Sequence, residues 1–472
     1  MHDTSGPSSD NATRRVVVVG GDAAGMSAAH AALRGAHARG HALDLVVLER
    51  TGHTSYSACG IPYWISGDVA AADDLVARTY QQHRDLGVDL RLGTRATAVD
   101  LDRRTVTAID DTETSTMLEF DELVFATGAA PIVPDWARTD TGALISGVHP
   151  VKNLDDGAVW LDLLAPHRNV RDAVIVGGGY IGVEMAETLL RRDVRTTLLT
   201  HGTVLGNLEP VLSDRVAAGL RAAGIDLRSH TEVAGVQVDS TGRVRAVTTA
   251  TGDELPADAV VLAVGVRPAT ELGAAVGLPL GSDGGYLPDP TGRLAPGVWA
   301  AGDCCECRHR ITGAVLFAPL GTHANKQGRV VGDNIAGGRA EFAGVLGSSI
   351  TRFVADGVHL EISRTGLSTA EAAAAGIDYA DLLTESDTAS GYMPEADPIA
   401  VQVVAGTADR RLLGMQIVGG RGAGKRIDTA AAAIWGGLTV DDLAAMDLAY
   451  SPPFATVWDA VQIAARRLAD RL

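Results

Sequence analysis

A single cysteine stands in a segment with the composition of a redox centre. Cys59 occurs in the run Ser55-Tyr56-Ser57-Ala58-Cys59-Gly60-Ile61-Pro62-Tyr63. The positions five residues before and five residues after it hold Thr54 and Trp64, so no second thiol is near in the sequence. A reactive thiol without a partner in its own chain must take sulfur or oxygen from another molecule. Cys59 is therefore the first candidate catalytic residue.

Two glycine-rich loops flank this cysteine, and each lies between a strand-like run and a helical stretch. Gly20-Gly21-Asp22-Ala23-Ala24-Gly25 follows the apolar run 16–19. Gly177-Gly178-Gly179-Tyr180-Ile181-Gly182 follows the apolar run 173–176. A glycine loop in this context typically places a pyrophosphate at a helix N-terminus. The chain is therefore expected to bind two dinucleotides that meet at one reaction centre.

The first unit has the features of a flavin site. Glu49 closes the next strand, 45–48, and lies 29 residues after Gly20 rather than the usual ~20, because the stretch 35–41 is inserted. Two later strands, 123–126 and 298–301, also end in small residues, and Asp303 is expected to hydrogen-bond a ribityl hydroxyl. The predicted FAD-binding residues are Gly20, Gly21, Ala23, Ala24, Gly25, Glu49, Thr127, Gly128, Gly302 and Asp303.

The second unit is expected to bind NAD(P)H. Its second strand ends in Thr200-His201, without the acid that usually holds the ribose 2′-hydroxyl of NADH. This favours NADPH and leaves NADH open. The predicted residues are Gly177, Gly179, Tyr180, Ile181, Gly182, Glu184, Thr200, His201 and Gly265.

These motifs predict an α/β chain with two Rossmann-like domains and a C-terminal α+β domain. The expected divisions are a flexible tail at 1–13, an FAD-binding domain at 14–150 and 269–340, an NAD(P)H-binding domain at 151–268, and a C-terminal domain at 347–472. The first domain is discontinuous in this scheme because Asp303 lies beyond the second glycine loop. Helices are expected at 26–33, 183–191, 428–435 and 457–472.

Composition excludes several function classes. The net charge of −18 opposes binding to nucleic acid and to anionic membranes. No uncharged apolar run approaches the ~18 residues of a membrane helix, and the N-terminus lacks the apolar core of a signal peptide, so we expect a cytoplasmic protein. Cys304, Cys305 and Cys307 lack a second ligand pair for zinc, so no metal is predicted and these residues are expected to pack at the start of a helix.

Together these motifs resemble the single-cysteine flavoprotein disulfide reductases, above all the coenzyme A disulfide reductases, with NADH oxidases and peroxidases as near relatives. The resemblance extends from about Arg14 to the C-terminus and includes the segments 319–328, 425–428 and 450–454. It implies a glutathione-reductase-like architecture and a homodimer in which the partner's C-terminal domain completes each active site.

The resemblance also implies roles for individual residues. Tyr450 and Tyr392 match the two tyrosines that line the disulfide site from the partner chain, and Ser55 is expected to hydrogen-bond near the sulfur. Arg34, at the expected end of the first helix, matches an arginine that binds coenzyme A, and Arg39 is a second candidate. A thiolate beside the flavin is expected to have a lowered pKa.

Three functions stay open. The first is NAD(P)H-dependent reduction of a low-molecular-weight disulfide, coenzyme A disulfide above others. The second is an NAD(P)H oxidase or peroxidase that uses a Cys59 sulfenic acid, and Ala23 disfavours it because the peroxide-handling relatives carry a histidine there. The third is a flavin redox sensor or electron-transfer protein. The chain ends without an appended sulfurtransferase domain, which disfavours persulfide reduction.

Overall fold

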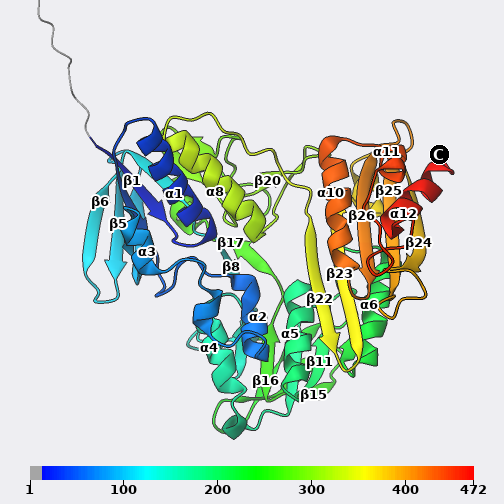
Figure 1. Cartoon of the computed structure of the whole chain (residues 1–472). Coiled ribbons are helices and arrows are strands. Elements are labelled where there is room, and N and C mark those ends of the chain that lie inside the picture. The colour runs from blue at the N-terminus through cyan, green and yellow to red at the C-terminus, as the bar shows by residue number, and fades with distance from the viewer. Residues whose placement is uncertain (1–12) are drawn as a thin grey trace, which may run out of the picture.

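A computed structural model describes residues 13–472 in three α/β units. Figure 1 shows the first unit in blue and cyan with a yellow-green helix from later in the chain beside it, the second unit mainly in green, and the C-terminal unit in yellow to red. All but the last residue of the expected flexible tail, 1–13, lie outside the described residues.

The first unit is built on a six-stranded sheet with the order β18-β19-β7-β1-β2-β3. Its strands are β1 (Arg14–Val19), β2 (Leu43–Leu48), β3 (Asp89–Arg91), β7 (Glu122–Phe125), β18 (Arg293–Ala295) and β19 (Val298–Ala300). Strand β1 pairs in parallel with both β2 and β7. Its side chains are buried on both faces, which explains the continuous run of valines.

Helices cover one face of this sheet, and a small antiparallel sheet covers the other. The helices are α1 (Ala23–Ala38) and α8 (Gly321–Ile335), and the small sheet holds β4 (Thr94–Asp100), β5 (Thr105–Asp110) and β6 (Ser115–Glu119). The two helices pack closely because α8 presents Gly328 and Gly332 to α1. A Cβ atom at either position would lie 2.2 Å from a carbonyl oxygen of α1.

The second unit holds a five-stranded parallel sheet with the order β12-β11-β10-β16-β9. Its strands are β9 (Val148–Pro150), β10 (Asp172–Val176), β11 (Arg195–Leu199), β12 (Asp226–Arg228) and β16 (Ala259–Leu262). Around them lie α4 (Leu154–Leu163), α5 (Tyr180–Arg191), α6 (Pro210–Ala222) and the sheet of β13 (Val233–Val238), β14 (Val244–Thr249) and β15 (Glu254–Pro256). The short pair β8 (Ala129–Pro131) and β17 (Val266–Pro268) joins the chain segments that run between the first two units.

The C-terminal unit is an antiparallel sheet with the order β22-β23-β26-β25-β24. Its strands are β22 (Ser349–Ala355), β23 (Val358–Gly366), β24 (Tyr379–Asp387), β25 (Pro398–Gly406) and β26 (Leu412–Gly419). Its helices are α9 (Thr369–Ala374), α10 (Ile427–Gly436), α11 (Val440–Ala445) and α12 (Ala460–Ala469), and the last three pack in one core with β25 and β26. Strands β25 and β26 are buried on both faces along nearly their whole length.

Shorter elements connect the units. They are α2 (Ile61–Ser66), α3 (Tyr80–Asp85), α7 (Glu271–Ala274), the strands β20 (Cys307–Arg308) and β21 (Val315–Leu316), and the 3₁₀ turns at 58–60, 72–75, 135–137, 166–168 and 424–426. No helix among residues 13–472 is both long and apolar enough to cross a lipid bilayer.

Several boundaries differ from the sequence predictions. The first helix continues to Ala38 through the supposed insertion, and the last begins only at Ala460 because 451–459 are held in an irregular conformation. Strand β9 joins the second sheet three residues before the predicted division at 151. The cysteine cluster begins no helix: Cys304 and Cys305 lie in the loop after β19, and Cys307 starts β20.

Candidate active site

The predicted FAD-binding residues gather at one edge of the first sheet. Strands β1, β2, β7 and β19 run in parallel, so their carboxyl ends meet at the same edge. The first glycine loop follows β1, Glu49 follows β2, Thr127-Gly128 follow β7, and Gly302-Asp303 follow β19 shortly after its end. This edge is where open parallel sheets bind nucleotides.

The first glycine loop leaves no space for side chains on its inner side. Gly20 has φ +111°, and a Cβ atom there would lie 2.1 Å from the carbonyl oxygen of Ala126. The loop leads into α1, whose first turn, with Ala23, Ala24 and Gly25, carries no acidic residue. The exposed peptide N–H groups of such a turn fit a pyrophosphate. These residues therefore fit the dinucleotide that the sequence predicts.

Two carboxylates lie at this edge in the positions expected for ribose and ribityl groups. Glu49 accepts hydrogen bonds from the Gly21 N–H and from the Thr51 N–H, both at 2.8 Å. Asp303 lies 3.5 Å from the ammonium group of Lys152. Both carboxylates retain free acceptor sites, because each protein contact uses only part of the capacity of a carboxylate.

The cysteine loop is attached directly to the first glycine loop. The hydroxyl of Thr54 is buried and donates to the carbonyl oxygen of Gly21 at 2.6 Å. Cys59 lies in the 3₁₀ turn 58–60 that leads into α2, and its side chain is exposed in the single chain. The other three cysteines are buried. Cys59 is thus the cysteine that a substrate can reach from solvent.

The protein groups around Cys59 do not lower the pKa of its thiol. The pKa of Cys59 is raised, first by the partial loss of water around the sulfur and then by the nearby carboxylate of Glu184. Lys152 acts in the opposite direction, and Asp303 adds to the increase. The protein itself therefore holds Cys59 towards its thiol form.

Ser55 does not contact the sulfur. Within residues 13–472, its hydroxyl makes no hydrogen bond to Cys59, and the residue has φ +49°. Its carbonyl oxygen accepts a hydrogen bond from the N–H of Ala77 at 2.8 Å. Ser55 shapes the loop through its backbone, and the predicted side-chain role finds no support in this geometry.

The second glycine loop repeats this arrangement on the second sheet. Gly177 has φ +114°, and a Cβ atom there would lie 2.2 Å from the Ala263 carbonyl oxygen. Gly179 precedes α5, which begins with Tyr180, Ile181 and Gly182. Gly265 follows β16, and Thr200-His201 follow β11, so these residues again share the carboxyl edge of parallel strands.

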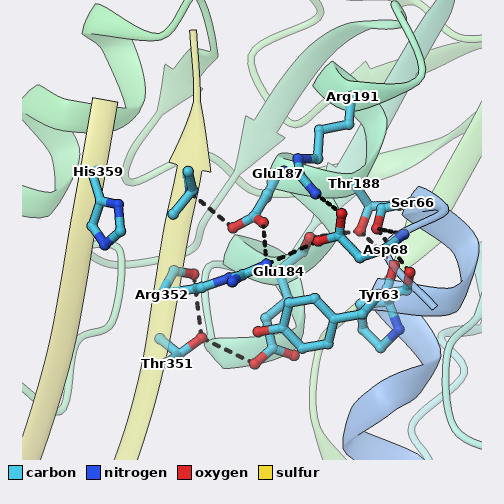
Figure 2. Close-up of polar contacts among 12 residues, drawn as sticks. Tyr63, Ser66, Asp68, Glu184, Glu187, Thr188, Arg191, Thr351, Arg352 and His359 are labelled. Atoms are coloured by element: carbon cyan, nitrogen blue, oxygen red, sulfur yellow. Dashed lines mark hydrogen bonds and ion pairs between the residues drawn. The ribbon is translucent and has the colours of Figure 1, made fainter. Parts of the chain in front are cut away.

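The cysteine-bearing segment, α5 and strand β22 meet beside this edge. The Thr188 hydroxyl of α5 donates to the Pro62 carbonyl oxygen of α2 at 3.0 Å. One turn earlier on α5, Glu184 accepts a hydrogen bond from the Thr351 hydroxyl of β22 at 3.0 Å. Figure 2 shows the ring of Tyr63 beside Glu184, with Arg352 next to both. Burial raises the pKa of Glu184 to about 7.

Tyr392 and Tyr450 lie in adjoining segments of the C-terminal unit. The Ser390 N–H donates to the Pro452 carbonyl oxygen at 2.9 Å, and Arg426 donates to carbonyl oxygens of both segments, at Thr388 and Phe454. Arg426 is fixed by a partly exposed ion pair with Asp459 at 2.9 Å. Both tyrosine side chains are exposed in the single chain, as is Phe454. The structure brings the two tyrosine-bearing segments together, and within the described chain no hydrogen bond joins either tyrosine to Cys59.

The two candidate arginines differ in their surroundings. Arg34 lies within α1 rather than at its end, and its side chain is exposed. Arg39 caps α1 and pairs with Asp333 of α8 at 3.4 Å. Arg39 therefore has a structural partner. Among the described residues, Arg34 forms neither a side-chain hydrogen bond nor an ion pair.

Sequence reasoning missed four polar residues near this centre: Asp22, Lys152, Thr351 and Arg352. Burial raises the pKa of Asp22 to about 6, and one of its carboxylate oxygens has no hydrogen-bond partner. Asp22 lies in the first glycine loop, whereas Lys152, Thr351 and Arg352 belong to no strand–loop–helix pattern, so only the folded chain shows the placement of these three. No group of three or more His, Cys, Asp or Glu side chains in residues 13–472 is arranged to hold a metal ion.

Two dinucleotide sites that converge on an accessible thiol define a flavin- and nicotinamide-dependent oxidoreductase, and comparison with known families agrees. The pyridine nucleotide-disulphide oxidoreductase model matches residues 14–323, and the dimerisation domain of the same family matches residues 357–461. The chain belongs to this family. It is an enzyme of the oxidoreductase class, and FAD and NAD(P)H are the cofactors of the family.

Curated relatives cover three activities. The chain is 35% identical over 459 residues to an NAD(P)H sulfur oxidoreductase (CoA-dependent) of Pyrococcus furiosus, covering 96% of this chain and 99% of the relative. It is 29% identical to an NADH oxidase of Methanocaldococcus jannaschii (97% and 99% covered), and 24% identical to a coenzyme A disulfide reductase of Staphylococcus epidermidis (89% and 92% covered). A solved NAD-dependent persulfide reductase from A. fulgidus is 33% identical, with a TM-score of 0.88 over 97% of this chain and 83% of that one.

These relatives correct one sequence argument. The absence of a further sulfurtransferase domain was expected to disfavour persulfide reduction. The NAD(P)H coenzyme A polysulfide/persulfide reductase of Pyrococcus horikoshii is 34% identical to this chain and is covered over 99% of its own length, so no such domain is part of it. The argument therefore carries no weight against a persulfide substrate.

Proposed function

We propose that this enzyme reduces a sulfur–sulfur bond carried by coenzyme A, most directly coenzyme A disulfide, with electrons from NAD(P)H and through Cys59. The observation that carries the proposal is the placement of one exposed, unpaired thiol on a loop attached to the first glycine loop. The relatives named for coenzyme A support the choice of carrier.

The thiolate of Cys59 attacks one sulfur of the disulfide, which forms a mixed disulfide and releases one coenzyme A thiolate. Two electrons and a proton then release the second coenzyme A and restore Cys59. FAD, when bound, supplies two-electron transfer between nicotinamide and sulfur. The loops after β1, β2, β7 and β19 would hold the FAD, and Thr54 ties the cysteine-bearing segment to the first of these loops.

The nicotinamide site favours NADPH. His201 and His230 are exposed on adjoining loops, which the hydrogen bond from His230 N–H to the Gly202 carbonyl oxygen holds together at 3.1 Å. Asp226, the nearest acid on the neighbouring strand, is paired with Arg228 at 3.0 Å. Two exposed histidines at this position can donate hydrogen bonds to a 2′-phosphate, which supports NADPH.

The test is a comparison of turnover by the FAD-loaded enzyme with coenzyme A disulfide, coenzyme A persulfide and oxygen, each with NADPH and NADH. We expect kcat/KM for one of the coenzyme A substrates to exceed that for oxygen by at least about a hundredfold. Non-reducing mass spectrometry of the Cys59 peptide should show a coenzyme A adduct in the resting enzyme. A single added oxygen with fast oxygen turnover would instead establish the oxidase reading.

Arg34 provides a test of coenzyme A recognition. Arg34→Ala should raise KM for the coenzyme A substrate roughly tenfold and leave kcat nearly unchanged, because a phosphate contact remote from the sulfur contributes equally to substrate and transition state. Arg39→Ala is the matched control, since Arg39 is already paired with Asp333. If the KM of Arg34→Ala is no higher than that of Arg39→Ala, Arg34 does not bind the coenzyme A substrate.

A further inference from the structure

An ion-pair cluster lies beside α2, the helix that follows Cys59, where the three units meet. Asp68, just beyond α2, pairs with Arg191 of α5 and with Arg352 of β22, the latter at 2.9 Å. Arg352 also lies 3.3 Å from Glu187, and its guanidinium carbon lies 4.9 Å from the centroid of the Tyr63 ring. Figure 2 shows these side chains converging from the three elements.

This cluster fixes α5 against α2 and β22. Glu187 is buried and accepts a hydrogen bond from the Val354 N–H of β22 at 2.8 Å, while Arg192, the C-cap of α5, donates to the Ile65 carbonyl oxygen of α2 at 2.7 Å. Together with the Thr188–Pro62 bond, these contacts hold Glu184 beside the N-terminal end of α2. Cys59 lies two residues before that helix begins.

Glu184 is the group in this arrangement whose charge can change near neutral pH. Its carboxyl receives a single hydrogen bond, from Thr351, and the ionised form is opposed by burial and by Glu187. The ionised form in turn raises the pKa of Cys59 and of Tyr63. The other charged groups that act on the thiol are Lys152 and Asp303.

We propose that Thr351 is a positioning residue of the redox centre, which acts from the C-terminal unit on Glu184 and thereby sets how readily the Cys59 thiol ionises. The role rests on the proposed function, in which Cys59 is the redox thiol. Strand β22 thereby takes part in the active site of its own chain, separately from any contribution of a partner subunit.

The effect of Thr351 on the ionisation of Cys59 follows from two interactions of Glu184, one with Thr351 and one with the thiol. The Thr351 hydroxyl stabilises the Glu184 carboxylate, so its loss leaves Glu184 neutral to a higher pH. A neutral Glu184 no longer opposes the Cys59 thiolate. Loss of the hydroxyl therefore increases the thiolate fraction above about pH 7, and has no such effect below pH 6, where Glu184 is protonated in every variant.

The experiment is the pH dependence of Cys59 alkylation by iodoacetamide in the FAD-loaded enzyme, from which any coenzyme A adduct has first been released with dithiothreitol and the reductant removed, followed by mass spectrometry of the Cys59 peptide. Near pH 8 we expect Glu184→Gln to react on the order of tenfold faster than the wild type, and Thr351→Val a few-fold faster. Thr351→Ser, which keeps the hydroxyl, is the matched control and should follow the wild type. All four rates should converge near pH 6.

Identical pH dependences of the Cys59 alkylation rate in the wild type, Glu184→Gln and Thr351→Val would overturn the proposal. A uniform change at every pH would do the same, since that is the result of a merely structural role. If Thr351→Val does not retain FAD, Thr351→Ala provides the same loss of the donor. The alkylation rate reports on the Cys59 thiol alone, so the role of Thr351 can be disproved while disulfide turnover through Cys59 is intact. The turnover of Cys59→Ser tests the proposed function separately.

Discussion

Replacing Cys59 by serine is expected to reduce turnover of the coenzyme A substrate by at least about a thousandfold, while the enzyme keeps its FAD. Serine has nearly the same size but does not ionise near neutral pH, and it cannot form the mixed disulfide. The FAD-binding loops follow β1, β2, β7 and β19, and none of their contacts uses the Cys59 side chain. Steady-state turnover and the flavin absorbance of the purified variant measure the two properties separately.

Cys307→Ser is the matched control, because it makes the same sulfur-to-oxygen change at a buried thiol on β20, outside the loops of the centre. It should turn over like the wild type. Retained turnover in Cys59→Ser would show that the accessible thiol is not the redox group and would support the flavin electron-transfer reading instead. Loss of FAD from Cys59→Ser would show a structural role for the thiol.

The fold could be predicted from local patterns, because the motifs of nucleotide-binding sheets are contiguous. A buried parallel strand, a glycine loop and a helix occur within about thirty residues, as in 16–33 and 173–191. The family and the three-unit fold follow from two such patterns in order, and both are confirmed. Helix ends were less predictable, since Gly35 reads as a helix breaker in the sequence but packs against Ala336, the C-cap of α8.

The site could be predicted only where its residues adjoin a motif. Cys59 and Glu49 lie next to strand and loop signals, and the structure places Glu49 at the sheet edge and ties the cysteine-bearing segment to the first glycine loop through Thr54. Thr351 lies far from the glycine loops in sequence and reaches Glu184 only because β22 packs along α5. The direction of the Cys59 pKa shift was also unpredictable, since it depends on burial and on Glu184, which are properties of the packed chain.

Tyr450 is expected to contribute the second large effect. Tyr450→Phe should lower kcat for the coenzyme A substrate by about a hundredfold, because the phenol is proposed to protonate the departing thiolate or to orient the disulfide. The backbone around it should be unaffected, since Arg426 and Ser390 hold the segment through main-chain carbonyl groups. Tyr392→Phe is the matched comparison and should have the smaller effect, because Tyr392 is proposed to assist.

Mixed dimers show which subunit supplies this tyrosine. Tyr450 is exposed in the single chain and has no contact with its own Cys59, while the dimerisation domain indicates a homodimer. If each site combines Cys59 of one subunit with Tyr450 of the other, a dimer of Cys59→Ser and Tyr450→Phe subunits holds one intact site. Equal co-expression makes about half of the dimers mixed, so about a quarter of wild-type turnover should return. Turnover no greater than the average of the two variants would show that each chain builds its own site, and that Tyr450 acts within its own chain or not at all.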